Sequence, residues 1–225
     1  MKRGALHKQK FLADEQEAIR VIREQEDDFK AAQQKFLLAV AKQVVVDGEK
    51  LGGRGGEAWT RELNALMTQA GQNIQFSPKG RSDDALDSVL RPWCEGKRLD
   101  PHPRQHAYCK CGTEPEDLLS AACLLAKQKV DPAFYSEQGQ EAGLMDGPDY
   151  GHATESTCAR CVHGVQREKA NLPYHLSALA EAEKAERLGV TKTERARGRA
   201  RANFIRAHIA RCFPTYSGGE CVSAK

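Results

Sequence analysis

The sequence predicts a mainly α-helical protein, and three observations support this fold class. Apolar residues recur at three- and four-residue steps in several stretches, which is the spacing of one helix face. Aromatic residues make up 6% of the chain and charged residues 29%, a balance that fits modest helical cores better than a β-sandwich. Glycine and proline separate the periodic stretches. We expect a helical region at 1–75, a region of helices and loops at 76–175 and basic helices at 176–225.

The first periodic stretch predicts a long helix from about Leu12 to Asp47. Its apolar face consists of Phe29, Ala32, Phe36, Val40 and Val44. This length exceeds that of an ordinary globular helix, so the helix could pack on its own chain, form a helical hairpin or join two copies in a homodimer. Four glycines at 52–56 predict a flexible joint after this helix. A phosphate-binding loop is disfavoured here, because such a loop requires a preceding strand and none is expected.

Shorter helices are expected in the middle of the chain. One carries Leu63, Leu66, Met67 and Ala70, and a second runs from Asp84 to Trp93. Thr113 to Glu116 has the capping-box pattern and predicts a helix that Asp131-Pro132 ends. Residues 131–157 are polar and show little periodicity, which predicts a long loop that needs an anchor at its ends.

The eight cysteines are interpreted from the compartment in which we expect the chain to fold. No apolar run approaches membrane-spanning length, and acidic residues follow the basic N-terminus where a secretory signal would be apolar. We therefore expect a soluble protein of the reducing cytoplasm, without membrane partners. Closely spaced cysteines in such a protein are more often metal ligands than disulfides.

Two close cysteine pairs predict a zinc site in the 76–175 region. The ligands would be Cys109, Cys111, Cys158 and Cys161, whose neighbours are polar or charged. Short cysteine spacings let one turn supply two thiolates to a tetrahedral ion. His106, His163 or Cys94 could replace one of them. Cys123 and Cys212, in contrast, fit the ordinary buried cysteine of an apolar helix. A structural zinc ion is favoured over a catalytic one, and the alternative is that all of these cysteines are simply buried.

The segment from Lys184 to Arg211 predicts a surface for a polyanion. It holds nine Lys and Arg residues against two Glu residues, a net charge of +7, whereas the whole chain carries +3. A capping box at Thr191–Glu194 opens its helix. An apolar stripe of Ala196, Ala200, Phe204 and Ala207 would pack on another helix. The residues expected to contact DNA are Lys192, Arg195, Arg197, Arg199, Arg201 and Arg206. The alternative is a charged helix that only faces water.

Two resemblances bear on function. Ala185, Gly189 and Val190 sit at offsets similar to those of a helix-turn-helix, with a basic second helix after them. Phe76-Ser77-Pro78-Lys79, then Ser82-Asp83-Asp84, then cysteine pairs resemble the late antitermination regulators of lambdoid phages. This resemblance implies a phage-type regulator that binds zinc and DNA and acts with RNA polymerase in the host cytoplasm.

An enzyme is the competing interpretation. Cys111-Gly112-Thr113, Gly151-His152 and the pair Cys158 and Cys161 are similar to HNH-class nucleases of phage recombination. That resemblance implies that His152 is a general base activating water beside a metal. A third class is a non-enzymatic protein that oligomerises through the N-terminal helix. Because no nucleophile, base and acid converge in the sequence, we expect no catalysis and favour a DNA-binding regulator of transcription.

Overall fold

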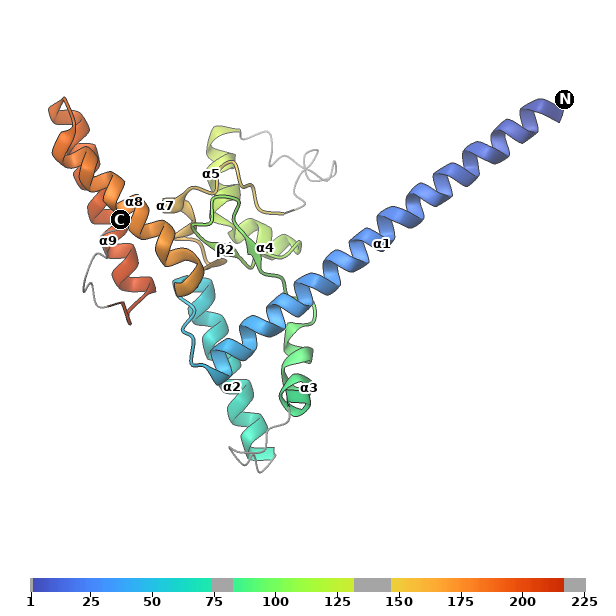
Figure 1. Ribbon diagram of the computed structural model, residues 1–225, viewed down its shortest axis with the longest axis horizontal. Coiled ribbons are helices and arrows are strands. Elements are labelled where there is room, and N and C mark those ends of the chain that lie inside the picture. Colours follow the sequence, from blue (N-terminus) through green and yellow to red (C-terminus); the bar gives the residue numbers. More distant parts are fainter. Residues whose placement is uncertain (1, 74–82, 132–146, 217–225) are drawn as a thin grey trace, which may run out of the picture.

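The computed structural model describes residues 2–73, 83–131 and 147–216 (Figure 1). Helices dominate these residues, which confirms the predicted mainly α fold with a long N-terminal helix. The elements are α1 (Lys2–Val46), α2 (Gly53–Asn73), α3 (Asp83–Cys94), β1 (Asp100–Pro101), β2 (Tyr108–Cys109), α4 (Pro115–Ser120), α5 (Ala122–Val130), α7 (Glu155–Cys158), β3 (Gly164–Val165), α8 (Glu168–Leu188) and α9 (Lys192–Cys212). The Phe76–Lys79 stretch, Ser82 and most of the predicted 131–157 loop lie outside the described residues.

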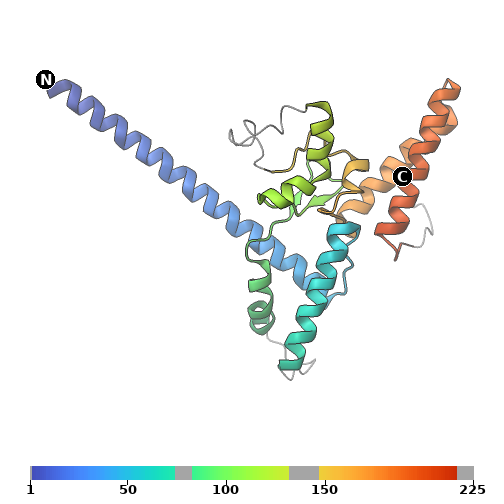
Figure 2. The ribbon, with the colours of Figure 1, turned by 180° about the vertical axis from the view of Figure 1, so that it is seen from behind.

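Helix α1 is 45 residues long and begins earlier than the sequence predicted. Its N-terminal part projects away from the rest of the molecule in both views (Figures 1 and 2). The predicted apolar face is buried at Val40 and Val44, whereas Phe29 is 61% exposed. Among the side chains of α1 whose burial is described, those of its C-terminal part contribute to a core, and the predicted homodimer contact stays a prediction.

The first core lies where α1, α2 and α3 meet. Leu37 of α1, Leu63 of α2 and Leu90 of α3 are each 0% exposed. Val165 of β3 belongs to the same cluster, so this core also anchors the small sheet. Burial of such apolar side chains is the main source of free energy for packing the three helices together.

Gly53, Gly55 and Gly56 lie in the first turn of α2, and Gly52 lies directly before it, so the predicted flexible joint is not formed. Gly52 exchanges two backbone hydrogen bonds with Gln166, of 2.9 and 2.8 Å. A Cβ atom on Gly53 or Gly55 would lie 2.8 or 2.9 Å from the carbonyl oxygen of Gly164. The glycines are thus required because the first turn of α2 lies directly against β3, which the local sequence did not reveal.

Three two-residue strands form an antiparallel sheet in the order β1–β2–β3. Asp100 pairs with Cys109, and Tyr108 pairs with Val165. Between β1 and β2 the chain turns back on itself, and the His102 amide donates a 2.9 Å hydrogen bond to the carbonyl oxygen of Ala107. This turn positions two histidines of the candidate site.

The helix expected after Thr113 is two helices, α4 and α5, separated at Ala121. The capping box predicted at Thr113 is not formed, because the N-cap is Glu114, whose side chain makes no capping bond. The Asp117 carboxylate instead accepts a 3.2 Å hydrogen bond from the Gly112 amide, which closes the turn just before α4. The capping box predicted at Thr191 is present at the start of α9.

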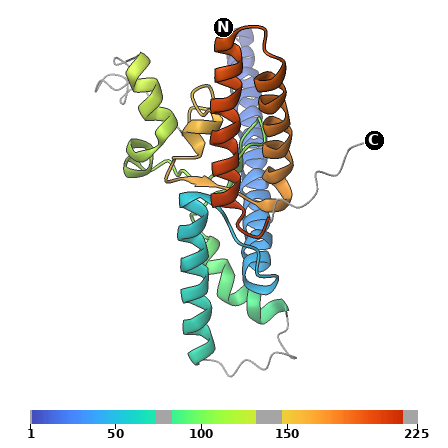
Figure 3. The same ribbon diagram turned by 90° about the vertical axis from the view of Figure 1, so that its left-hand side faces the viewer.

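Helices α8 and α9 form an antiparallel hairpin (Figure 3). Gly198 lets them approach closely, since a Cβ atom there would lie 2.4 Å from the Glu186 amide nitrogen. The buried face of α9 consists of Gly198, Ala202, Ile205, His208, Ile209 and Cys212. The predicted stripe was wrong for Ala196, Ala200 and Ala207, which are exposed. The small residues Gly198 and Ala202, on the opposite face of α9, allow it to pack closely against α8. The spacing of alanines in the sequence did not identify this face.

Candidate functional site

The turn between β1 and β2 brings His102 and His106 together. Their rings are 3.9 Å apart between centroids, and the two side chains are 3% and 1% exposed. Gln105 adopts a positive φ of 59°, and its carbonyl oxygen accepts a 2.8 Å hydrogen bond from Asn171 of α8. The Nδ1 atom of His102 accepts a hydrogen bond from the Arg104 amide, so Nε2 is the ring nitrogen that remains for another partner.

Three nitrogen atoms of these histidines are buried without a hydrogen-bond partner. They are Nε2 of His102 and both ring nitrogens of His106. A buried polar atom without a partner is unfavourable by about 1–3 kcal/mol, so a bound ion or water molecule at these atoms would stabilise the fold. The Cys158 thiol on α7 completes a group whose ligand atoms all lie within 4.8 Å of one another. His102, His106 and Cys158, here called the His–Cys group, could hold a metal ion.

A small cavity of about 20 Å³ adjoins the His–Cys group. Three further thiols line it, those of Cys109 on β2, Cys123 on α5 and Cys161 after α7. The Cys161 sulfur accepts a 3.5 Å hydrogen bond from the Ala122 amide, a contact that suits a thiolate. The cavity is large enough for a single ion or water molecule and too small for an organic substrate.

The protonation of the His–Cys group follows from its burial. Burial and the neighbouring His102 lower the pKa of His106 to about 4, and burial also lowers the pKa of His102. Both imidazoles are therefore neutral near pH 7, which is the form that binds metals. Burial and the nearby Cys161 raise the pKa of the Cys158 thiol to about 12. A metal ion would displace that proton on binding.

The structure distributes the sequence-predicted zinc ligands unevenly. Cys109, Cys158 and Cys161 line the same cavity. The Cys111 thiol does not line it: it lies 3.5 and 3.7 Å from the carbonyl oxygens of Gly112 and Asp117 and also contacts the Cys109 thiol. Of the suggested substitutes, only His106 belongs to the His–Cys group.

The other two substitutes lie elsewhere. His163 Nε2 is 2.7 Å from the Ser120 hydroxyl, and Cys94 is buried in the first core. Two residues were missed by the sequence analysis, His102 and the cavity thiol of Cys123. The four-residue interval between His102 and His106 was the available signal, since it is a common spacing for paired ligands.

A second layer of polar contacts connects the His–Cys group to α8. His175, which is 0% exposed, donates from Nε2 to the backbone oxygen of His106 at 3.1 Å. Its Nδ1 atom lies 3.0 Å from the Glu155 carboxylate on α7. Burial acts to raise the pKa of Glu155, but the hydrogen bond and charge of His175, with Arg201, leave it lowered. One α8 side chain therefore contacts both segments that carry the His–Cys group, the β1–β2 turn and α7.

The arginines of the hairpin differ in their availability. Arg195 donates to the Gly189 carbonyl oxygen at 2.7 Å and so holds the turn. Arg199 pairs with Glu186 at 2.8 Å, and Arg206 with Glu183 at 2.7 Å. Arg201 is 3.9 Å from Glu155. These four predicted DNA contacts therefore have partners on the protein.

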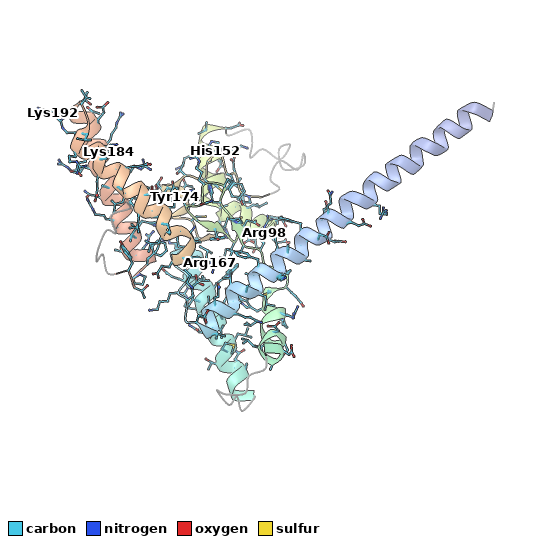
Figure 4. All side chains as sticks on the ribbon, viewed as in Figure 1. Arg98, His152, Arg167, Tyr174, Lys184 and Lys192 are labelled. Atoms are coloured by element: carbon cyan, nitrogen blue, oxygen red, sulfur yellow. The ribbon has the colours of Figure 1, made fainter. Side chains whose placement is uncertain are left out.

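Arg199, Arg201 and Arg206 are exposed as well, but four other cations of the hairpin are exposed without such partners. They are Lys184 and Arg187 on α8 and Lys192 and Arg197 on α9, and none forms an ion pair with another described residue. Lys184 and Lys192 lie toward the free end of the hairpin (Figure 4). The turn between the helices exposes Leu188 (61%) and Val190 (89%). The antiparallel contact differs from a DNA-binding helix-turn-helix, whose helices cross at about 90–120°.

His152, the general base of the nuclease interpretation, lies outside the His–Cys group. Its Nδ1 atom is 3.2 Å from the Asp149 carboxylate, which also pairs with Lys127. Its side chain is 37% exposed. The structure therefore does not bring His152 to the candidate metal ligands.

Comparisons with protein-family models, curated proteins and solved structures find no match for this chain. None of the helices in the described ranges combines the length and hydropathy needed to cross a membrane. The site is therefore interpreted from its own residues and geometry.

Proposed function

We propose that this chain binds a zinc ion through the His–Cys group and binds DNA through the α8–α9 hairpin, as a regulator of transcription. The observation that carries the proposal is the set of partnerless ring nitrogens on His102 and His106, facing the Cys158 thiol. Imidazole and thiolate are the ligands that zinc prefers in proteins. The fourth ligand would be a thiol of the adjoining cavity, from Cys109, Cys123 or Cys161.

The burial of the site supports a structural role for the zinc ion. A catalytic zinc ion keeps one coordination position open to water and substrate. Here His102 and His106 are almost fully buried, and the adjoining cavity holds little more than one small ion. The ligands come from the β1–β2 turn and from α7, so a bound ion would cross-link two segments more than 50 residues apart. Such a cross-link stabilises a small mixed core.

The exposed cations of the hairpin support DNA as the partner. Lys184, Arg187, Lys192 and Arg197 are exposed around its free end without ion pairs to described residues. Unpaired cations can neutralise phosphates without first breaking an internal ion pair. Lys192 and Arg197 belong to the six contacts expected from the sequence, whereas Lys184 and Arg187 are added on the evidence of the structure. The action with RNA polymerase is supported by the sequence resemblance to phage antitermination regulators.

A salt titration of binding to a pool of duplex DNA tests the DNA proposal. Log affinity should fall linearly with log salt, and Arg187→Ala with Lys192→Ala should flatten the slope by roughly two units. Arg199→Ala with Arg206→Ala is the matched control, because those arginines pair with glutamates, and it should change the slope less. Equal slopes for all three proteins, or no binding at low salt, would refute a DNA contact at this end of the hairpin.

A further inference from the structure

A second and larger cavity lies on a different part of the surface. Its volume is about 470 Å³, within the range that accommodates a mononucleotide-sized ligand. Four segments far apart in sequence meet around it: the start of α2, residues 96–98, the loop before α4, and Val162-His163. None of the six residues proposed above as certain or alternative zinc ligands lines it, although Lys110 and Val162 directly follow two of them in the sequence.

The walls of this cavity are mainly cationic. Arg54, Lys97, Arg98 and Lys110 line it, against the carboxylates of Glu62 and Asp117. Glu62 lies 3.9 Å from the Lys97 ammonium group, so part of the acidic charge is balanced within the wall. Glu62 accepts a 3.1 Å hydrogen bond from the Trp93 indole, and Asp117 accepts one from the Gly112 amide. We call this feature the cationic cavity.

Lys110 is the clearest sign that an anion belongs there. Its ammonium group lies 5.5 Å from the centre of the buried Trp59 ring and forms no ion pair with a described residue. The Lys110 residue is half-buried. A cation that is partly removed from water without a close counter-ion gains free energy when an anionic ligand supplies one.

Arg54 provides a second cation from another direction. It is exposed in the first turn of α2, a helix of 21 residues whose N-terminus carries partial positive charge. Its planar guanidinium can make paired hydrogen bonds to phosphate oxygens, whereas Lys110 acts as a point charge. Arg98 is less available, since it pairs with Asp100 at 2.6 Å.

We propose that the cationic cavity binds a phosphate group, with Lys110 and Arg54 as its main contacts. The phosphate would belong to a free nucleotide or to the backbone of a nucleic acid, since both present the same oxygens. The inference stands apart from the proposed zinc and DNA functions, because it uses none of their residues.

Calorimetric titration at constant ionic strength tests this inference, with adenosine diphosphate and a short DNA duplex as separate probes. Saturable binding of adenosine diphosphate identifies a nucleotide site, and binding of the duplex alone identifies a backbone phosphate. In either case Lys110→Met and Arg54→Gln should each weaken binding of that probe by about tenfold, the loss expected for one charge-assisted contact. Arg61→Gln, an exposed arginine on the same helix outside the cavity, should bind like the parent protein.

The hairpin variant Arg187→Ala with Lys192→Ala separates the two proposals. Adenosine diphosphate binding that is unchanged in this variant and weakened by Lys110→Met supports the cationic cavity, whatever the hairpin does. If only the duplex binds, its affinity must still fall in Arg54→Gln, an exposed position whose replacement leaves the core intact. The proposal is overturned if neither probe binds, or if both cavity variants bind like Arg61→Gln.

Discussion

The Nε2 atom of His175 donates a 3.1 Å hydrogen bond to the backbone oxygen of His106. This contact joins α8, one half of the basic hairpin, to a member of the His–Cys group. The opposite ring nitrogen of His175 meets Glu155, three residues before Cys158 on α7. His175 therefore supports both the proposed metal ligands and the packing of the α8–α9 hairpin against them, and a change at His175 should affect both.

Replacement of His175 by alanine should lower the free energy of unfolding by about 2–4 kcal/mol. The variant leaves a cavity and removes hydrogen bonds to Glu155 and to the His106 backbone. Zinc affinity should also fall by about tenfold or more, because the support of two ligands is lost. Urea unfolding and a competition titration with a zinc chelator measure the two effects. Glu183→Ala, in an exposed ion pair on the same helix, should change stability by less than about 1 kcal/mol.

Substitution of Gly198 by alanine should destabilise the hairpin by about 2 kcal/mol or more. A Cβ atom at this position would lie 2.4 Å from the Glu186 amide nitrogen and 2.8 Å from the Ala185 carbonyl carbon. The α8–α9 contact would have to separate, because both obstacles are backbone atoms. Ala200→Ser on the exposed face of the same helix is the control. A Gly198→Ala protein as stable as the parent in thermal unfolding contradicts the close contact.

The thiols of the cavity should differ from Cys111 in their effect on metal binding. Cys158→Ser should abolish tight zinc binding, and one of the serine variants at Cys109, Cys123 and Cys161 should do the same. Cys111→Ser should retain the ion, because that thiol donates to backbone oxygens outside the cavity. Zinc content after dialysis distinguishes these cases. Loss of zinc from the Cys111 variant as well as from the variants at Cys109, Cys158 and Cys161 would favour the original set of four cysteines.

Stability should decrease as the pH falls from about 6.5 to about 4, partly through His208. Burial lowers the pKa of His208 to about 4, with smaller effects of the same sign from His175 and Arg211 and an opposing one from Glu155. The unfolded chain binds the proton near pH 6.5, so within this window it holds more protons than the folded protein. The stability that depends on neutral His208 is fully present above pH 6.5 and is lost as the pH falls toward 4, and the full loss is roughly 1–3 kcal/mol.

His208→Gln isolates this contribution. Its free energy of unfolding, measured in urea at several pH values, should depend less steeply on pH than that of the parent between pH 6.5 and 4. His152→Gln is the control, since His152 is partly exposed beside Asp149. Parallel pH profiles for His208→Gln and the parent would show that His208 is not held neutral by its surroundings.

Local sequence signals predicted the helices but not the contacts between them. The Thr191 capping box and the periodic apolar residues of α1 operate within a few neighbouring residues, and the structure contains both. The role of the 52–56 glycines depends on β3, more than 100 residues away. The ion pairs of Arg199 and Arg206 likewise depend on glutamates of α8. Charge counting along the chain could not separate these arginines from the exposed ones.

The candidate site shows the same limit. The cysteine spacing indicated a metal, and Cys158 with the suggested His106 does belong to the His–Cys group. His102 stands in a proline-rich turn that gave no helical or strand pattern, and it faces His106 only because β1 and β2 pair. Cys123 resembled a buried core cysteine because its neighbours in sequence are apolar, although its thiol lines the cavity.

Metal analysis with cobalt substitution tests the central claim most directly. The protein, purified without chelators, should contain about one zinc ion per chain. Its cobalt form should show the visible bands of a tetrahedral site and the near-ultraviolet band of a cobalt–thiolate bond. His102→Ala and His106→Ala should each lose the ion and these bands, while His152→Ala should keep both. A protein that folds without stoichiometric metal, or one whose His102→Ala and His106→Ala forms retain the ion and its spectrum, would contradict the His–Cys centre.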